Sequence, residues 1–279
     1  MIRVTALTLA LLLGGGASAG LATPLQDRRA VARGAGWLER QPLTIPAGQQ
    51  ADLIVALRAA GTPSVALRPR VRALARSGPA YALNPGQAAK IAQAAMAVGA
   101  NPRRFGKVNY IGRINRGYRN GRYGRDAFSH ALALLALAQS RRRIPRRAIR
   151  ELSRTRGGGG WSFQLKRTGT DEVDTTALVI RALRAAGVSR GNKDLREATS
   201  WLRRQRNRRG GFDSRGGRRA TEANSTAAAV LALTAMGKRT ATERREIRTL
   251  QQRNGSFWWR RSTTGSTLLA TLDALSALT

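Results

Sequence analysis

Residues 201–237 read WLRRQRNRRGGFDSRGGRRATEANSTAAAVLALTAMG. This stretch holds the end of a polar helix, a turn rich in glycine and arginine around Phe212, and an Ala/Leu-rich helix that closes on Gly237. Glycine is typical of a helix C-cap, because the left-handed conformation costs little in a residue without Cβ. The stretch therefore predicts a helical hairpin with a structured turn.

The second half of this hairpin recurs along the chain. A copy without the glycine spans residues 131–138, and another runs from Ser266 to Leu278 at the C-terminus. The 218 residues from Gly61 to the end hold five further units of about 44 residues each, the length of two helices and two loops. The chain is therefore predicted to be a helical repeat, whose glycine-closed copies are 56–61, 94–99, 182–187 and 232–237.

The two helices of each unit differ in polarity. The Ala/Leu-rich helix is apolar almost all round, which indicates burial, and the helix before it is amphipathic and rich in arginine. This alternation indicates inner and outer rings. We expect an all-α fold, an (α/α)6 toroid of about six hairpins over residues 35–279, preceded by a linker over 20–34. An open α-solenoid is the alternative.

The N-terminus has the features of an export signal. Met1–Arg3 is a short basic start, residues 4–13 form an apolar run too short to span a bilayer, and Ala17–Ala19 fits a cleavage site. We expect residues 1–19 to be a signal peptide and the protein to be secreted or to reside in the cell envelope. No transmembrane anchor is then expected after cleavage, and an uncleaved anchor is the alternative.

Composition limits the chemistry. The chain has no cysteine, so disulfides, thiolate ligands and cysteine nucleophiles are excluded. Its 50 Lys and Arg residues against 15 acidic ones give a net charge of +35. Such a charge favours binding to a cell-surface polyanion. Arginine is spread over nearly every segment, so a general bias toward arginine at solvated positions explains the charge equally well.

The turns between outer and inner helices carry the family signal. Each turn of the last three units has glycine beside an aromatic residue and then an Asp/Ser/Thr-rich helix start, as in residues 157–163 followed by 174–177. This pattern resembles the QW repeat of squalene-hopene cyclases and of prenyltransferase β subunits. It matches strongly over 148–279 and more weakly over 30–147. Another toroid, such as a polysaccharide-lyase-like barrel, is the alternative.

The resemblance implies two candidate acids. Class II terpene cyclases protonate an alkene with the middle aspartate of an Asp-x-Asp-Asp-Thr-Ala motif, and residues 172–177 here read EVDTTA. Asp174 aligns with the proton donor and Glu172 with the first acid, whereas Thr175 replaces the third. Asp174 could instead cap the inner helix, a task that Asp performs in ordinary repeats. The full cyclases also have a second helical domain, for which this chain has no room.

One histidine is a third candidate. His130 lies in the third inner helix and could face the central cavity as an acid or base, although a lone histidine among apolar neighbours is usually a packing residue. The zinc site of protein prenyltransferases needs aspartate, cysteine and histidine, so no zinc and no other resident metal is expected. No cofactor is expected either, with Mg²⁺ considered only if the protein is an enzyme.

A segment of repeat three alternates arginine, tyrosine and glycine. Glycine at this density opposes a helix, so residues 110–125 are predicted to be an extended loop that presents guanidinium groups and rings to phosphates, sugars or bases. The loop lies at the same mouth of the toroid as the Gly-aromatic turns. The expected ligand-binding residues are Arg113, Arg116, Tyr118, Arg119, Arg122, Tyr123 and Arg125 of this loop, and Trp161, Phe212 and Trp258 of the turns.

Three functions remain open at this point. The first is a non-catalytic binding module for a lipid, isoprenoid, glycan or peptide. The second is a small terpene cyclase or prenyl-transfer enzyme that uses Asp174. The third is an adhesion protein that binds the cell surface through charge alone. The sequence does not indicate the oligomeric state.

Overall fold

The computed structural model describes residues 24–216, 220–261, 263 and 268–279. Twelve α-helices and one two-stranded sheet lie in this part of the chain. The helices alternate between two rings in chain order. The outer ring is α1 (Leu25–Glu39), α3 (Arg68–Tyr81), α5 (Tyr110–Arg116), α7 (Arg146–Thr155), α9 (Lys193–Arg204) and α11 (Ala241–Arg248). The inner ring is α2 (Ala47–Ala59), α4 (Pro85–Ala97), α6 (Ala127–Gln139), α8 (Val173–Ala185), α10 (Ala223–Ala235) and α12 (Leu268–Leu278).

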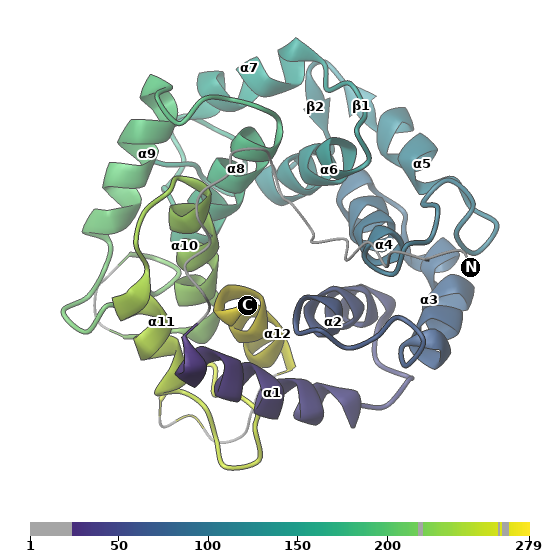
Figure 1. The fold of residues 1–279 in the computed structure, drawn as a ribbon. Coiled ribbons are helices and arrows are strands. Elements are labelled where there is room, and N and C mark those ends of the chain that lie inside the picture. The colour runs from purple at the N-terminus through teal and green to yellow at the C-terminus, as the bar shows by residue number, and fades with distance from the viewer. Residues whose placement is uncertain (1–23, 217–219, 262, 264–267) are drawn as a thin grey trace, which may run out of the picture.

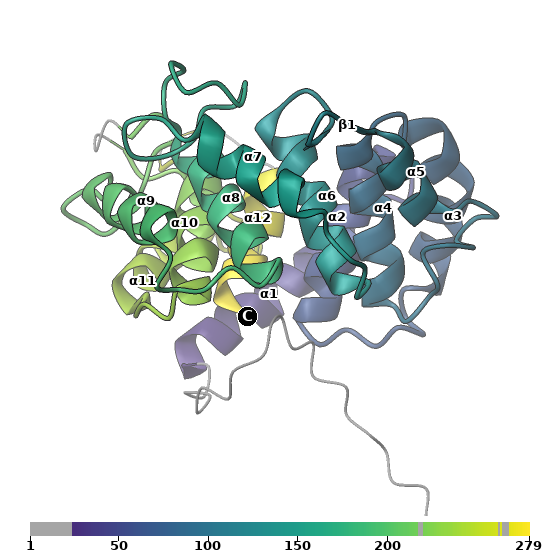
Figure 2. The same ribbon diagram turned by 90° about the horizontal axis from the view of Figure 1, so that it is seen from above.

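The inner helices form a closed ring around a central axis (Figure 1). Each packs on the next one in the chain, and the last, α12, packs on α2. The side view shows the inner helices standing side by side within the outer ones (Figure 2). The expected (α/α)6 toroid is therefore confirmed, and the open solenoid is wrong for this chain.

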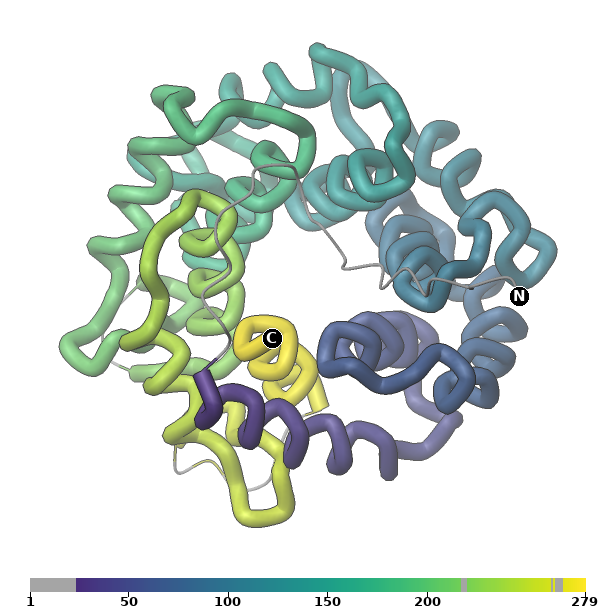
Figure 3. The backbone as a smooth tube through the Cα atoms, in the orientation of Figure 1, coloured from purple at the N-terminus to yellow at the C-terminus, as the bar shows by residue number. Residues whose placement is uncertain are grey.

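Helix α1 closes the ring across the outside of α12 (Figure 3). Asp27 of α1 is fully buried and accepts a hydrogen bond from Arg244 Nε at 2.6 Å, and it also pairs with Arg248 of α11. Gln251 Nε2 donates to the Ala30 carbonyl oxygen at 2.8 Å. The toroid thus begins at Leu25, and the expected linker over 20–34 is wrong from that residue onward because α1 supplies the outer helix of repeat one.

The glycines that end the inner helices have the conformation that the sequence predicts. Gly61, Gly99, Gly187 and Gly237 have φ of +95°, +77°, +86° and +71°, in the left-handed region where a residue without Cβ is unstrained. Repeat three has no glycine at this point. Arg141 takes the left-handed conformation there instead, with φ of +53°.

One hydrogen bond recurs in the turns and ties each to its inner helix. The backbone N–H of a buried aromatic residue donates to the side chain of the fourth residue of the helix. The distances are 2.9 Å from Trp161 to Thr176 Oγ1, 3.0 Å from Phe212 to Thr226 Oγ1 and 3.0 Å from Phe257 to Thr271 Oγ1. A glutamine follows the outer helix in repeats one and five and binds the main chain there. Gln41 and Gln205 donate to the Trp37 and Trp201 carbonyl oxygens.

The predicted signal peptide, residues 1–19, lies outside the described residues. No described helix has both the length and the apolar character needed to cross a bilayer.

Candidate functional site

A cavity of about 320 Å³ lies on the axis of the toroid, and all six inner helices line it. The lining side chains follow one rule of spacing: they come mainly from the second, sixth and ninth residues of each helix, which share one face at helical periodicity. In α8 these are Asp174, Leu178 and Arg181.

The cavity wall has a polar and an apolar side. Three consecutive inner helices, α12, α2 and α4, contribute most of the polar side, whereas α6, α8 and α10 contribute most of the apolar side. The larger apolar side chains of α6, α8 and α10 are Phe128, Leu132, Leu135, Leu178 and Leu231, and these helices also contribute the polar residues Asp174, Arg181 and Asn224. The polar ones from α12, α2 and α4 are Ser276, Asp273, Asp52, Lys90 and Gln93. An amphipathic ligand fits such a wall better than a purely apolar one does.

Asp174 faces this cavity from the first turn of α8. It is not the N-cap, which is Glu172, and its Oδ1 has no hydrogen-bond partner among the described residues. Burial raises the pKa of the Asp174 carboxyl to about 6. The sequence-based alternative, that Asp174 caps the helix, is therefore wrong, and the residue is available to a bound molecule.

Two pairs of polar groups cross between neighbouring inner helices. Lys90 Nζ of α4 lies 2.6 Å from Asp52 Oδ2 of α2, and Asn224 of α10 donates to Asp273 of α12. Burial raises the pKa of the Asp273 carboxyl to about 7. Near neutral pH this carboxyl is therefore only partly ionised, which reduces the negative charge in the cavity.

Arg181 is the cavity's isolated cation. Its guanidinium forms no hydrogen bond or ion pair with a residue in the described part of the chain, and burial lowers its pKa. An arginine held away from water normally has a carboxylate partner, because the desolvation of a guanidinium is unfavourable. Arg181 is thus a donor fork directed into the cavity without a protein acceptor.

Sequence reasoning missed Arg181, Asp273, Lys90, Asp52 and Asn224. A signal for them exists in the chain, since each is a polar residue inside an otherwise Ala/Leu-rich helix. The shared second, sixth and ninth positions would have placed them on one face.

Glu172 does not face the cavity. It precedes α8, and its Oε2 accepts a hydrogen bond from Thr175 Oγ1 at 2.7 Å. Asp126 with Ser129 and Glu222 with Ser225 form the same pair at the starts of α6 and α10. Glu172 is therefore a recurring helix-start residue, and its expected place beside Asp174 as a second acid in the cavity is wrong.

His130 is also structural. It is fully buried as the fourth residue of α6, where repeats four, five and six have threonine. Its Nδ1 accepts from the Tyr123 N–H at 2.9 Å, and its Nε2 lies 3.0 Å from the Ala148 carbonyl oxygen. Both ring nitrogens are thus engaged with the main chain. The expectation that His130 faces the cavity is wrong, since it and Tyr123 form the repeat-three version of the turn.

The aromatic residues expected to bind ligand lie mostly in the core. Trp161 and Phe212 are fully buried, and Trp161 Nε1 donates to the Leu152 carbonyl oxygen at 2.7 Å. In repeat six the equivalent buried ring is Phe257, while the neighbouring Trp258 is half-buried and does not line the cavity. The expected ligand contacts of Trp161 and Phe212 are therefore wrong, because these buried rings hold their turns to the inner helices, whereas the role of the half-buried Trp258 stays a prediction.

The basic segment of repeat three is not an extended loop. Residues 110–116 form α5, and the two strands β1 (Tyr118–Arg119) and β2 (Arg122–Tyr123) pair as an antiparallel hairpin. The helix forms despite its glycine because Asn109 caps it and because Tyr110, Ile111 and Ile114 are buried.

Several groups of this segment already have protein partners. Arg113 donates to the Pro79 and Ala82 carbonyl oxygens, and Arg122 pairs with Glu151 at 2.6 Å. The Tyr118 ring packs against the buried Tyr123 ring at a tilt of 40°. The segment leaves Arg116, Arg119 and Arg125 exposed, so it does not present a continuous array of free guanidinium groups.

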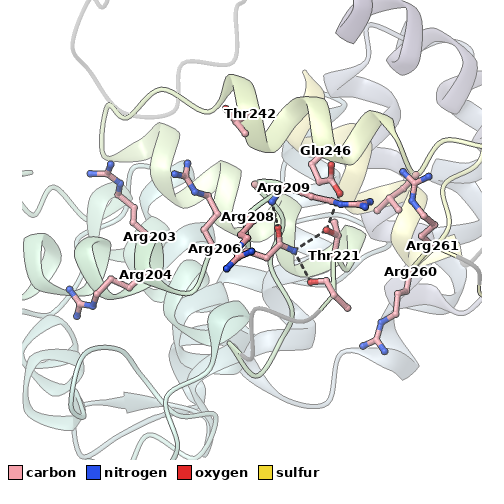
Figure 4. A pocket seen from close by; sticks show the side chains of 14 residues that line it. Arg203, Arg204, Arg206, Arg208, Arg209, Thr221, Thr242, Glu246, Arg260 and Arg261 are labelled. Carbon is pink, nitrogen blue, oxygen red and sulfur yellow. Dashed lines mark hydrogen bonds between the residues drawn. The ribbon is translucent and has the colours of Figure 1, made fainter.

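A basic groove lies instead at the rim between repeats five and six (Figure 4). It has a volume of about 1010 Å³ and is lined by arginines of α9, of the turn that follows α9, and of the turn before α12. The run Arg203, Arg204, Arg206, Arg208 and Arg209 was the sequence signal for it. Within the described part of the chain, no cluster of three or more His, Asp and Glu side chains could hold a metal ion.

Comparison with known families agrees with this architecture. The model of the squalene-hopene cyclase C-terminal domain matches residues 124–271, which is more than half of the chain. The match runs from the turn of repeat three to the first turn of α12. No curated protein matches the sequence.

Solved structures share the fold at low identity. The type II terpene cyclase MstE from Scytonema is 14% identical with a TM-score of 0.63, and the match covers 91% of this chain and 97% of that one. A variant of MstE in complex with geranylgeranyl dihydroxybenzoate, its substrate, is 14% identical with a TM-score of 0.65, over 91% and 96%.

A third structure, ent-copalyl diphosphate synthase from Streptomyces platensis, is 16% identical with a TM-score of 0.53, and the match covers 83% of this chain and 49% of that one. At these identities the likeness establishes the fold. The closed ring, the turns that bind the fourth residue of α6, α8, α10 and α12, and the sequence match over repeats three to six lead to one conclusion: the chain belongs to the squalene-hopene cyclase C-terminal domain family.

Proposed function

We propose that this protein is a binding module that holds an isoprenoid-type ligand in its central cavity without transforming it. The observation that carries the proposal is the mixed cavity wall, in which leucines and Phe128 of α6, α8 and α10 stand beside polar side chains that include Arg181 and Asp174. Its volume of about 320 Å³ lies at the lower end of the range of about 300–1000 Å³ that is usual for small-molecule sites. The similar toroid of MstE, which holds a prenylated ligand, supports the same chemistry.

The polar side would receive the head of the ligand. Arg181 has donors without protein acceptors, and Gln93 and Ser276 occupy the equivalent ninth positions of α4 and α12. An anionic or hydroxyl head there would supply the missing acceptor, while a prenyl chain packs on Phe128, Leu132 and their neighbours. We further propose that the protein performs this role outside the cytoplasm, on the evidence of residues 1–19.

The acid chemistry of the cavity favours binding over catalysis. Protonation of an alkene requires a strong acid, and burial makes Asp174 a weaker acid than an ordinary aspartate. The neighbouring Thr175 hydroxyl donates to Glu172 and so does not stabilise an Asp174 carboxylate. A hydrogen bond with Ser225 lowers the pKa of Asp174 in part, but the effect of burial is larger.

Binding can be tested by filling the cavity. Ala228 of α10 lines it, so Ala228→Trp should abolish binding of farnesol, measured by tryptophan fluorescence or calorimetry on the purified protein. Ala241→Trp, on the exposed first residue of α11, is the matched control and should bind as the wild type does. Failure of the folded wild-type protein to bind farnesol or a longer prenyl alcohol would contradict the proposal.

A second candidate function is proton-initiated cyclisation by Asp174, because its Oδ1 is unpartnered and faces the apolar wall. Incubation with linear polyprenyl substrates and analysis of the products decides between the two. We expect no cyclic product from the wild type and unchanged prenyl-alcohol binding by Asp174→Asn. A cyclic product that the folded Asp174→Asn variant fails to form would establish the enzyme instead.

A further inference from the structure

The groove between repeats five and six is strongly cationic. Seven arginines line it, against a single lining carboxylate, Glu246. Glu246 accepts a hydrogen bond from Thr221 Oγ1 at 3.1 Å rather than pairing with one of the lining arginines. The arginines are Arg203, Arg204, Arg206, Arg208, Arg209, Arg260 and Arg261.

Most of these arginines have no counter-charge in the protein. Arg206 pairs with Glu243 at 2.9 Å, and Arg260 pairs with Glu222. Among the described residues, the other five have no carboxylate within ion-pair distance. Several like charges lining one concave surface repel each other, and an anionic ligand would relieve this repulsion.

The loop that carries the central arginines is held in place. Asn207 Oδ1 accepts from the backbone N–H groups of Arg209 and Gly211, each at 3.0 Å. Asn207 Nδ2 donates to the Ala220 carbonyl oxygen and to Thr221 Oγ1, each at 3.1 Å (Figure 4). A loop that is already ordered loses less conformational entropy on binding.

The shape of the groove restricts its occupant. The arginines extend from α9 across the turn of repeat five to Arg261, so one small anion cannot contact them all (Figure 4). The lining contains no aromatic side chain. Single-stranded nucleic acids stack their bases on aromatic rings, and sugars also favour such faces, so neither base nor sugar has a platform here. Arginine forks match phosphate oxygens with two parallel hydrogen bonds.

We propose that this groove is a binding site for inorganic polyphosphate, a linear chain of phosphate groups without bases or sugars. The site is separate from the central cavity, with which it shares no lining residue, and it does not depend on the ligand of that cavity. Under this proposal, part of the net charge of +35 acts at one defined anion-binding site and not only over the whole surface.

The test removes three unpaired groove charges and compares them with three charges elsewhere. The groove variant is Arg208→Gln, Arg209→Gln and Arg261→Gln together. The control is Arg142→Gln, Arg143→Gln and Arg146→Gln, two exposed arginines of the α6–α7 connection and the exposed first residue of α7, which also have no carboxylate partner in the described part of the chain. Both variants lose the same charge, and glutamine keeps part of the side-chain stem.

Binding is measured by the fluorescence anisotropy of labelled short-chain polyphosphate at several salt concentrations. We expect the groove variant to bind on the order of tenfold more weakly and with a shallower salt dependence, because fewer phosphate charges are neutralised. The control should stay within about twofold of the wild type, as expected for charges beyond a screening length of about 10 Å. Circular dichroism confirms the fold of both variants.

Three results would overturn the proposal. The first is that the wild type does not bind polyphosphate at physiological salt. Equal loss in the two variants would show that overall charge, and not the groove, binds the anion. Tighter binding of single-stranded DNA than of polyphosphate at equal phosphate concentration would show that bases are recognised and that the occupant is a nucleic acid.

Discussion

Replacement of Asp27 with asparagine is expected to lower the free energy of unfolding by about 2–3 kcal/mol, because it leaves two arginines of α11 without their carboxylate. Asp27 is fully buried, whereas the Arg244 and Arg248 side chains are 17% and 20% exposed, so solvent screens part of the loss. The pair joins the first and last repeats. Its loss should therefore loosen the closure of the ring and leave the contacts between the middle repeats intact.

Urea unfolding and amide hydrogen exchange measure this effect. Exchange should accelerate in α1 and α11 more than in α4, α6 or α8. Glu39→Gln is the matched control, because it removes a carboxylate from the same helix at an exposed position whose hydrogen bond is to Thr62. Unchanged stability and unchanged protection of α1 in Asp27→Asn would mean that apolar packing alone closes the ring.

Arg181→Gln is expected to weaken the binding of a prenyl carboxylic acid, such as farnesoic acid, by about thirtyfold. Charge-assisted hydrogen bonds from a guanidinium contribute about 2 kcal/mol, and Arg181 donates no hydrogen bond to an acceptor in the described part of the chain. Binding of farnesol should change by less than about twofold, since an alcohol carries no charge. Ser276→Ala, at the equivalent position of α12, is the control and should leave the preference for the acid in place.

The same ligand pair gives a pH dependence. Above its pKa of about 7, Asp273 is ionised and competes with an acidic head for Arg181, and Asp174 acts in the same direction above about 6. Asp52 stays paired with Lys90. A bound carboxylate raises the pKa of Asp273 further, so binding takes up a proton and affinity for the acid falls from pH 6 to pH 8. Wild-type protein that binds acid and alcohol equally at pH 6 would show that Arg181 does not hold the head.

The architecture could be predicted because its signals are local. Gly61 and Gly187, for example, each end an apolar helix because glycine adopts the left-handed conformation without strain, and this does not depend on the rest of the chain. The Gly-aromatic turns and the Ala/Leu-rich helices likewise repeat at a fixed spacing, and six hairpins with one buried helix each have few ways to pack other than as a ring.

The roles of single polar residues were less accessible, since they depend on which way a helix face turns in the assembled ring. From the sequence His130 is a catalytic candidate. In the structure it accepts a hydrogen bond from the Tyr123 N–H of its turn, as threonine does in repeats four to six. From the sequence Asp174 is a candidate N-cap. In the structure α8 begins at Val173, so that Glu172 is the N-cap and Asp174 lies in the first turn. The sequence likewise predicts Arg122 and Arg113 to be free for a ligand. In the structure Arg122 pairs with Glu151, and Arg113 donates to two carbonyl oxygens.

By itself the sequence determined the all-α repeat and its family resemblance, since these follow from helix periodicity and from caps that act over a few residues, whereas the closure of the ring is seen only in the packing of α12 on α2 and of α1 on α12. The tertiary structure alone decided three further features: the polar and apolar sides of the cavity, the isolation of Arg181 and the groove of unpaired arginines. The physical reason is that each depends on how side chains from different repeats meet in the assembled ring, and such pairings, of which Asp27 with Arg244 is the most distant in the chain, leave no periodic signal.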